Sequence, residues 1–174
     1  LNSCLKTFLD QLEPSQLPDM RVLIRPDDLF SAAEPYLYEC GWSNGDVKEC
    51  LLKDIHHLIL TFASITKSYL VDVRLEIISD DACWKFHRDA VKTRLLTTYR
   101  GSTTEWVQPE HAAQALREQK LYNGPLDTLQ INDVAIFRGG SAQSTRGIVH
   151  RSPQITGTGC TRLLLCLNER STAS

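Results

Sequence analysis

The hydrophobic period of this chain changes near residue 68, and that change constrains the fold more than any other feature. Residues 46–68, DVKECLLKDIHHLILTFASITKS, carry apolar side chains at helical spacing, which predicts a long amphipathic helix. In residues 69–79, YLVDVRLEIIS, apolar and charged side chains alternate, which predicts a strand with one buried face. The chain is therefore expected to place a helical layer against a sheet.

The remaining patterns divide the chain in the same way. Before residue 46 we expect a helix over 1–14, a strand over 20–26 and a helix over 27–41 interrupted at Pro35. After residue 79 strands dominate, with one helix over 109–120; the expected strands cover 91–99, 133–138, 147–151 and 160–168. Helices and strands do not alternate, so a doubly wound sheet is disfavoured. The sequence predicts the α+β class, with an antiparallel sheet or barrel buttressed by N-terminal helices.

Length and composition set the outer limits. A chain of 174 residues suits a single domain, 1–174, in which 1–68 form a mainly helical support and 69–170 the β core. The net charge of −2 gives no pull toward nucleic acid, and the apolar runs are too short to span a bilayer. Six cysteines without CxxC pairs, and no export signal, lead us to expect free, mostly buried thiols and a cytoplasmic location. The oligomeric state is left open.

The segment 83–101, CWKFHRDAVKTRLLTTYRG, raises the question of chemistry. On a strand, residues i and i+2 point to the same face, so His87 and Asp89 would present an imidazole and a carboxylate toward one point. These are two of the three ligands of a facial iron(II) site, which two histidines and one carboxylate form.

The third ligand has few candidates. His56 and His57 are neighbours on the long helix and point in different directions, and His111 starts a polar helix. His150, in GIVHRSP, ends a short apolar strand after a glycine-rich loop, so it is the favoured third ligand. The alternative for His150 is a hydrogen-bonded histidine of the core or of a sheet edge.

An arginine accompanies the predicted ligands. In CTRLLLCLN, residues 160–168, Arg162 shares a face with Leu164 and Cys166, opposite to three leucines. A buried arginine is costly unless it meets an anion. Arg162 lies twelve residues beyond His150, which suits a carboxylate-bearing cosubstrate held by a bidentate contact.

This ordered set resembles the signature of the iron(II)- and 2-oxoglutarate-dependent dioxygenases, over about residues 70–168. GSTTEWV, through Gly101, Thr104 and Trp106, resembles the Gly-x-x-Thr-x-aromatic loop of the prolyl-hydroxylase-like branch. DVAIF resembles the strand before the distal histidine, and HRSPQITGTGCTR resembles the segment from that histidine to the basic residue. The wording FHRDAVKTRLLTTYRG is also similar to that of a small bacterial family of unknown function linked to zinc-responsive genes.

The resemblance implies a double-stranded β-helix, also called a jelly roll or cupin-like barrel. It implies that His87, Asp89 and His150 are the catalytic iron ligands and that Arg162 binds the distal carboxylate of 2-oxoglutarate. O₂ would then be consumed, giving succinate, carbon dioxide and an oxidant that attacks a C–H bond. A second 2-oxoglutarate contact is expected from one of three residues of the following strand: Tyr99, Thr97 or Arg94.

Several alternatives stay open. The same triad would serve a non-catalytic zinc-binding or metal-homeostasis protein, because zinc binds such sites more tightly than iron. A barrel without metal is the third reading. The basic residues around the site indicate either an anionic substrate, small or peptide-borne, or solvated outer faces. The loop 138–147, RGGSAQSTRG, is expected to be either a lid that brings Arg146 to the substrate or a plain connector.

Overall fold

The computed structural model describes residues 3–42, 45–140 and 147–169. The helices are α1 (Ser3–Gln11), α2 (Leu29–Glu39), α3 (Asp46–Thr66) and α4 (Ala112–Glu118), with four 3₁₀ turns at Pro14–Gln16, Pro26–Asp28, Pro109–His111 and Gln119–Leu121. The strands are β1 (Met20–Ile24), β2 (Val71–Ile78), β3 (Thr93–Arg100), β4 (Glu105–Val107), β5 (Asp127–Thr128), β6 (Ala135–Arg138), β7 (Val149–Arg151) and β8 (Arg162–Glu169).

Two antiparallel sheets organise these strands. The larger has the order β1-β2-β8-β3-β6, and the smaller has the order β5-β4-β7. The α+β class predicted from the sequence is confirmed. The two sheets do not close into a barrel within the described ranges.

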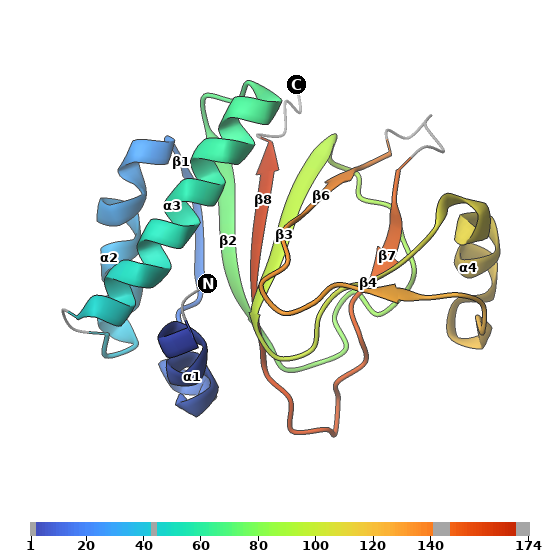
Figure 1. Cartoon of the computed structure of the whole chain (residues 1–174), viewed down its shortest axis with the longest axis horizontal. Helices are drawn as coiled ribbons and strands as arrows, with labels where there is room; N and C mark the ends of the chain where they lie inside the picture. The colour runs from blue at the N-terminus through green and yellow to red at the C-terminus, as the bar shows by residue number, and fades with distance from the viewer. Residues whose placement is uncertain (1–2, 43–44, 141–146, 170–174) are drawn as a thin grey trace.

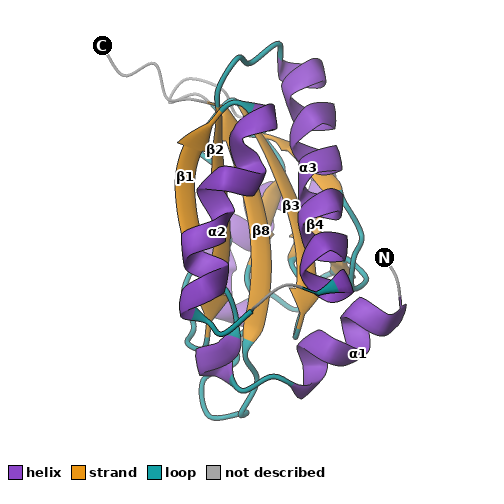
Figure 2. Cartoon of the chain, turned by 90° about the vertical axis from the view of Figure 1, so that its left-hand side faces the viewer, coloured by secondary structure: helices purple, strands orange, loops and turns teal. Residues whose placement is uncertain are grey.

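Helices cover one face of the larger sheet, and the smaller sheet lies on its other side. Figure 1 shows α2 and α3 to the left of β2, β8 and β3, with β4, β7 and α4 to the right. In the view of Figure 2, α2 and α3 lie over the strands. The sheet is thus a wall between a helical layer and a second β layer.

The alternation of side chains explains why the sheet has two different faces. Leu163, Leu165 and Leu167 of β8 face the helices and are fully buried in the main core. Leu164 and Cys166 face the other way, in a second cluster that includes Phe137 of β6. Burying each large apolar side chain contributes roughly 1.5–3 kcal/mol, so both faces of β8 stabilise the fold.

The structure departs from the sequence-based expectations in several places. Helix α2 runs unbroken through Pro35, because Leu29, Ala33 and Leu37 on its buried face hold it against the core. The short strands β4 and β5 were not predicted, since three and two residues give no readable period. Only Cys166 of the six cysteines is buried, so the expectation of mostly buried thiols is wrong.

Two further expectations concern the loop 138–147 and the absence of a membrane span. Residues 141–146, with Arg146, lie outside them, so the proposed lid receives no structural account. Across the part of the chain that is described, no helix has the length and apolar character needed to cross a bilayer.

Candidate metal centre

His87 and His150 are brought together by the backbone. His87 lies between β2 and β3, and it forms an isolated antiparallel bridge with His150 of β7. Each backbone amide donates to the other residue's carbonyl, at 3.0 and 3.1 Å. This pairing joins two segments that are far apart in the sequence and aligns their side chains.

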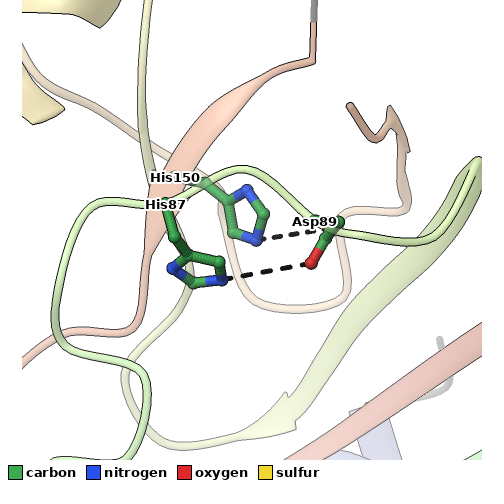
Figure 3. A group of neighbouring side chains, drawn as sticks. All are labelled: His87, Asp89 and His150. Atoms are coloured by element: carbon green, nitrogen blue, oxygen red, sulfur yellow. Dashed lines mark ion pairs between the residues drawn. The ribbon is translucent and has the colours of Figure 1, made fainter. Parts of the chain in front are cut away.

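Asp89 reaches the same point by a different route from the predicted one. It lies two residues beyond the bridge in a segment without strand structure, so the expectation of one strand carrying both side chains is wrong. The Asp89 carbonyl accepts a hydrogen bond of 2.9 Å from the Gly140 amide, which anchors this segment beyond β6. The carboxylate nevertheless points at the two imidazoles (Figure 3).

The three side chains form a compact set of ligand atoms. Nε2 of His150 is 3.6 Å from Oδ2 of Asp89, and Nε2 of His87 is 4.0 Å from Oδ1. One ligand atom from each residue lies within 4.8 Å of the other two. Ligand distances of about 2.0–2.2 Å to a cation are within reach of small side-chain rotations from this arrangement.

Backbone carbonyls orient both imidazoles. Nδ1 of His87 is 2.8 Å from the Lys85 carbonyl, and Nδ1 of His150 is 3.3 Å from the Ile148 carbonyl. Since a carbonyl only accepts, these contacts favour the tautomers that carry hydrogen on Nδ1. The Nε2 lone pairs are then directed at Asp89, the usual outer arrangement of histidine metal ligands.

Burial adds to this preparation. Desolvation lowers the pKa of His150 to about 4, although the neighbouring Asp89 carboxylate opposes the shift. His150 is therefore neutral near pH 7, which is the form that binds metals.

The two oxygens of the Asp89 carboxylate differ in their surroundings. Asp89 is 4% exposed, and Oδ1 accepts a hydrogen bond from Nη1 of Arg94. Oδ2 is buried and has no hydrogen-bond partner among the described residues. Leaving such an oxygen unpaired is costly, and a cation between Oδ2 and the two Nε2 atoms would satisfy it. The donor set of two imidazoles and a carboxylate fits iron(II) or zinc.

A cavity of about 560 Å³ opens beside the centre. Both histidines line it, as do Arg94 and, on the walls that β3 and β8 provide, Leu96 and Leu164. This volume suits a small molecule or the side chain of a peptide.

Arg162 is the largest fully buried side chain of the fold. Its Nε donates to the Ser102 carbonyl at 2.6 Å, and its Nη1 donates to Oγ of Ser152 at 2.8 Å. Nη2 is buried and has no partner within the described residues, and burial lowers the pKa of the guanidinium. Ser152 lies in the cavity wall, so its hydroxyl links the buried guanidinium of Arg162 to the cavity.

Gly101 allows the close packing around Arg162. Its φ of +83° is in the left-handed region, and an added Cβ would lie 2.7 Å from the Thr161 carbonyl oxygen and 3.2 Å from Cγ of Arg162. Only glycine fits there without movement. Thr104 of the same GSTTEWV segment lines the cavity, and Trp106 pairs with His150 across β4 and β7.

Of the three residues considered for a second 2-oxoglutarate contact, the structure brings one to the site. Arg94 contacts Asp89, whereas Thr97 and Tyr99 lie on the helix-facing side of β3. The hydroxyl of Tyr99 donates to Oδ2 of Asp54 in α3 at 2.6 Å, and burial raises the pKa of Tyr99. Positions of odd number in β3 share the helix side, which separates these two residues from the metal centre.

We therefore expect Tyr99→Phe to destabilise the fold by about 1–3 kcal/mol, because Asp54 loses its donor, without a change in metal affinity. Urea denaturation and a metal titration of the variant measure the two quantities. A lower metal affinity at full folding would contradict this placement of Tyr99.

Asn168 was not predicted from the sequence, although it contacts Arg94, which in turn contacts Asp89. Asn168 is 1% exposed and receives a hydrogen bond of 2.7 Å from Nε of Arg94. The signal was an asparagine directly after the apolar run LLLCL, residues 163–167. Such a buried amide needs hydrogen-bond partners, and one of them, Arg94, also contacts Asp89.

Comparison with known proteins gives a family and no function. The chain matches the family described as "Protein of unknown function (DUF1826)" over residues 1–168. A comparison with the curated proteins finds no match. Because the match covers nearly the whole chain, from the helical layer through β8, the protein belongs to the DUF1826 family.

Proposed function

We propose that this protein is an iron(II)- and 2-oxoglutarate-dependent oxygenase that hydroxylates a small or peptide-borne substrate. The observation that carries the proposal is a pair of buried polar atoms without a hydrogen-bond partner among the described residues, on two side chains that each contact a residue lining one cavity. One atom is Oδ2 of Asp89, which faces two oriented imidazoles, and the other is Nη2 of Arg162, whose Nη1 donates to the cavity-lining Ser152. A metal with a carboxylate cosubstrate would satisfy both.

The proposal extends to the fold. We propose that the two antiparallel sheets are the two halves of an open double-stranded β-helix, with the centre between them. In support, His150 lies on β7 of the smaller sheet and Arg162 on β8 of the larger one. The apolar cluster with Leu96, Leu164 and Phe137 fills space on the same side of the larger sheet.

Each residue has a stated task in this scheme. His87, Asp89 and His150 would hold iron(II), which would supply the activation of O₂ and the oxidative decarboxylation of 2-oxoglutarate needed for C–H hydroxylation. Arg162, with Ser152, holds the distal carboxylate of the cosubstrate. Arg94, which lines the cavity, forms an ion pair with Asp89 and fixes that ligand.

A second candidate function is zinc binding without turnover, as in a metal-homeostasis protein. The observation in its favour is the neutral state of His150 together with a buried aspartate, a donor set that zinc accepts as readily as iron. This candidate assigns no ligand to the unpartnered Nη2 of Arg162, so we place it second.

An anaerobic metal analysis with a turnover assay tests the proposal. The protein is loaded with iron(II), and 2-oxoglutarate consumption, succinate formation and O₂ uptake are followed without added substrate. We expect slow, equal formation of succinate and loss of 2-oxoglutarate, abolished in the zinc-loaded protein. Tight zinc binding with no detectable 2-oxoglutarate binding would instead support the second candidate.

A further inference from the structure

A chain of polar contacts crosses the larger sheet and ends on the Asp89 carboxylate. Asn168 of β8 is its centre: Arg94 of β3 donates to Oδ1 of Asn168 at 2.7 Å, and the amide nitrogen of Asn168 donates to Oδ2 of Asp72 in β2 at 3.1 Å. Arg74 closes the far end with a contact of 2.7 Å to the same oxygen of Asp72. The roles proposed above for the metal ligands and for Arg162 do not involve this chain of polar contacts.

The register of the sheet fixes the chain in place. Arg94 and Asp72 are the residues directly opposite Asn168 on its two neighbouring strands. The oxygen and the nitrogen of the buried Asn168 side-chain amide each form a hydrogen bond. Nε of Arg94 donates to this oxygen, while Nη1 of the same guanidinium donates to Asp89. A planar guanidinium anchored at Nε has a fixed direction for its other donors.

We propose that Arg94 makes Asp89 a one-oxygen metal ligand. A carboxylate binds a cation through one oxygen or through both. Oδ1 of Asp89 faces the Arg94 guanidinium, whose hydrogen and positive charge keep a cation away, whereas Oδ2 is free of hydrogen bonds from the described residues. This inference rests on the proposed function only in requiring a divalent cation at the triad.

The denticity of Asp89 determines how many positions stay open on the metal. One oxygen and two Nε2 atoms leave three positions on an octahedral ion, and a second oxygen would take one of them. A chelating 2-oxo acid and O₂ together require three positions. Arg94 is thus a positioning residue that keeps room for both on the metal.

Manganese(II) serves as the probe, because the water on a bound manganese ion is counted by water-proton relaxation. In the protein without cosubstrate, Arg94→Met frees Oδ1 to bind. We expect the number of water molecules on the bound manganese ion to fall from about three to about two, while the metal stays bound. Among the described residues Asn168 forms no hydrogen bond with the Asp89 carboxylate, but it holds Arg94, so Asn168→Leu is expected to lower the water number part of the way.

Arg100→Met is the matched control. Arg100 is on the same strand, and its Nη1 donates to the Leu12 carbonyl at 2.7 Å, so the variant loses a comparable hydrogen bond away from the centre. Its water number is expected to equal that of the wild type.

Equal water numbers in the wild type and in a folded, manganese-loaded Arg94→Met protein would overturn the proposal. If that variant does not fold, Asn168→Leu decides in its place, and a water number equal to that of the wild type in this second variant overturns the proposal. Failure of the wild type to bind manganese, iron or zinc is a different result, since it overturns the metal centre itself. A different outcome is a wild-type protein that binds the metal but not 2-oxoglutarate, while Arg94→Met still has fewer water molecules on manganese than the wild type. That outcome overturns the oxygenase function alone.

Discussion

Replacing His87, Asp89 or His150 by alanine is expected to lower the affinity for iron(II) and zinc by more than about 100-fold, the upper range for loss of a residue that only supports a ligand. Each replacement removes one of the three donors that lie within 4.8 Å of one another. Metal content after dialysis and competition with a chelator of known affinity measure the effect.

His57→Ala is the matched control for these variants. His57 is an exposed histidine of α3, on the helical side of the larger sheet, and its loss is expected to leave the metal content unchanged. Full metal occupancy in all three triad variants would rule out this centre.

Replacing Arg162 by leucine is expected to leave the metal bound and to weaken 2-oxoglutarate binding by about 2–5 kcal/mol, the cost of removing one partner from a buried charged contact. The reason is the unpartnered Nη2 of this fully buried side chain, which has no anion among the described residues. Calorimetric titration of the metal-loaded variant with 2-oxoglutarate measures the change.

Arg162→Lys separates charge from geometry. A lysine keeps the charge but not the planar fork, so it is expected to restore only part of the binding. Ser152→Ala removes the hydroxyl that holds Nη1 and is expected to weaken binding less than the leucine variant does. Unchanged 2-oxoglutarate affinity in a folded Arg162→Leu protein would give Arg162 a purely structural role.

The sequence was sufficient to predict the layers of the fold. Alternation in 69–79 and in 160–168 predicted β2 and β8, and the helical stripe of 46–68 predicted α3, because each is long enough to show its period. The division of β8 into two faces, with Leu163 and Arg162 on opposite sides, was also predicted correctly, and the structure adds that Leu163 faces the helices.

The proximity of His87, Asp89 and His150 was predictable from the sequence, and the geometry of the group was less so. His87 and Asp89 were selected by a strand rule, yet only His87 forms a bridge, and the approach of Asp89 depends on contacts with Gly140 and Arg94. Those contacts arise from chain segments that no local pattern connects. For the same reason, the face on which Tyr99 lies became clear only when β3 was placed between β8 and β6.

The backbone bridge between His87 and His150 has a further consequence in polymer terms. It joins positions that are 63 residues apart, and bringing together the ends of so long a segment costs an unfolded chain considerable entropy. An ion held by both side chains would act there as a removable cross-link, as a disulfide does in proteins that have one. The supply of metal would then govern how long the folded chain survives.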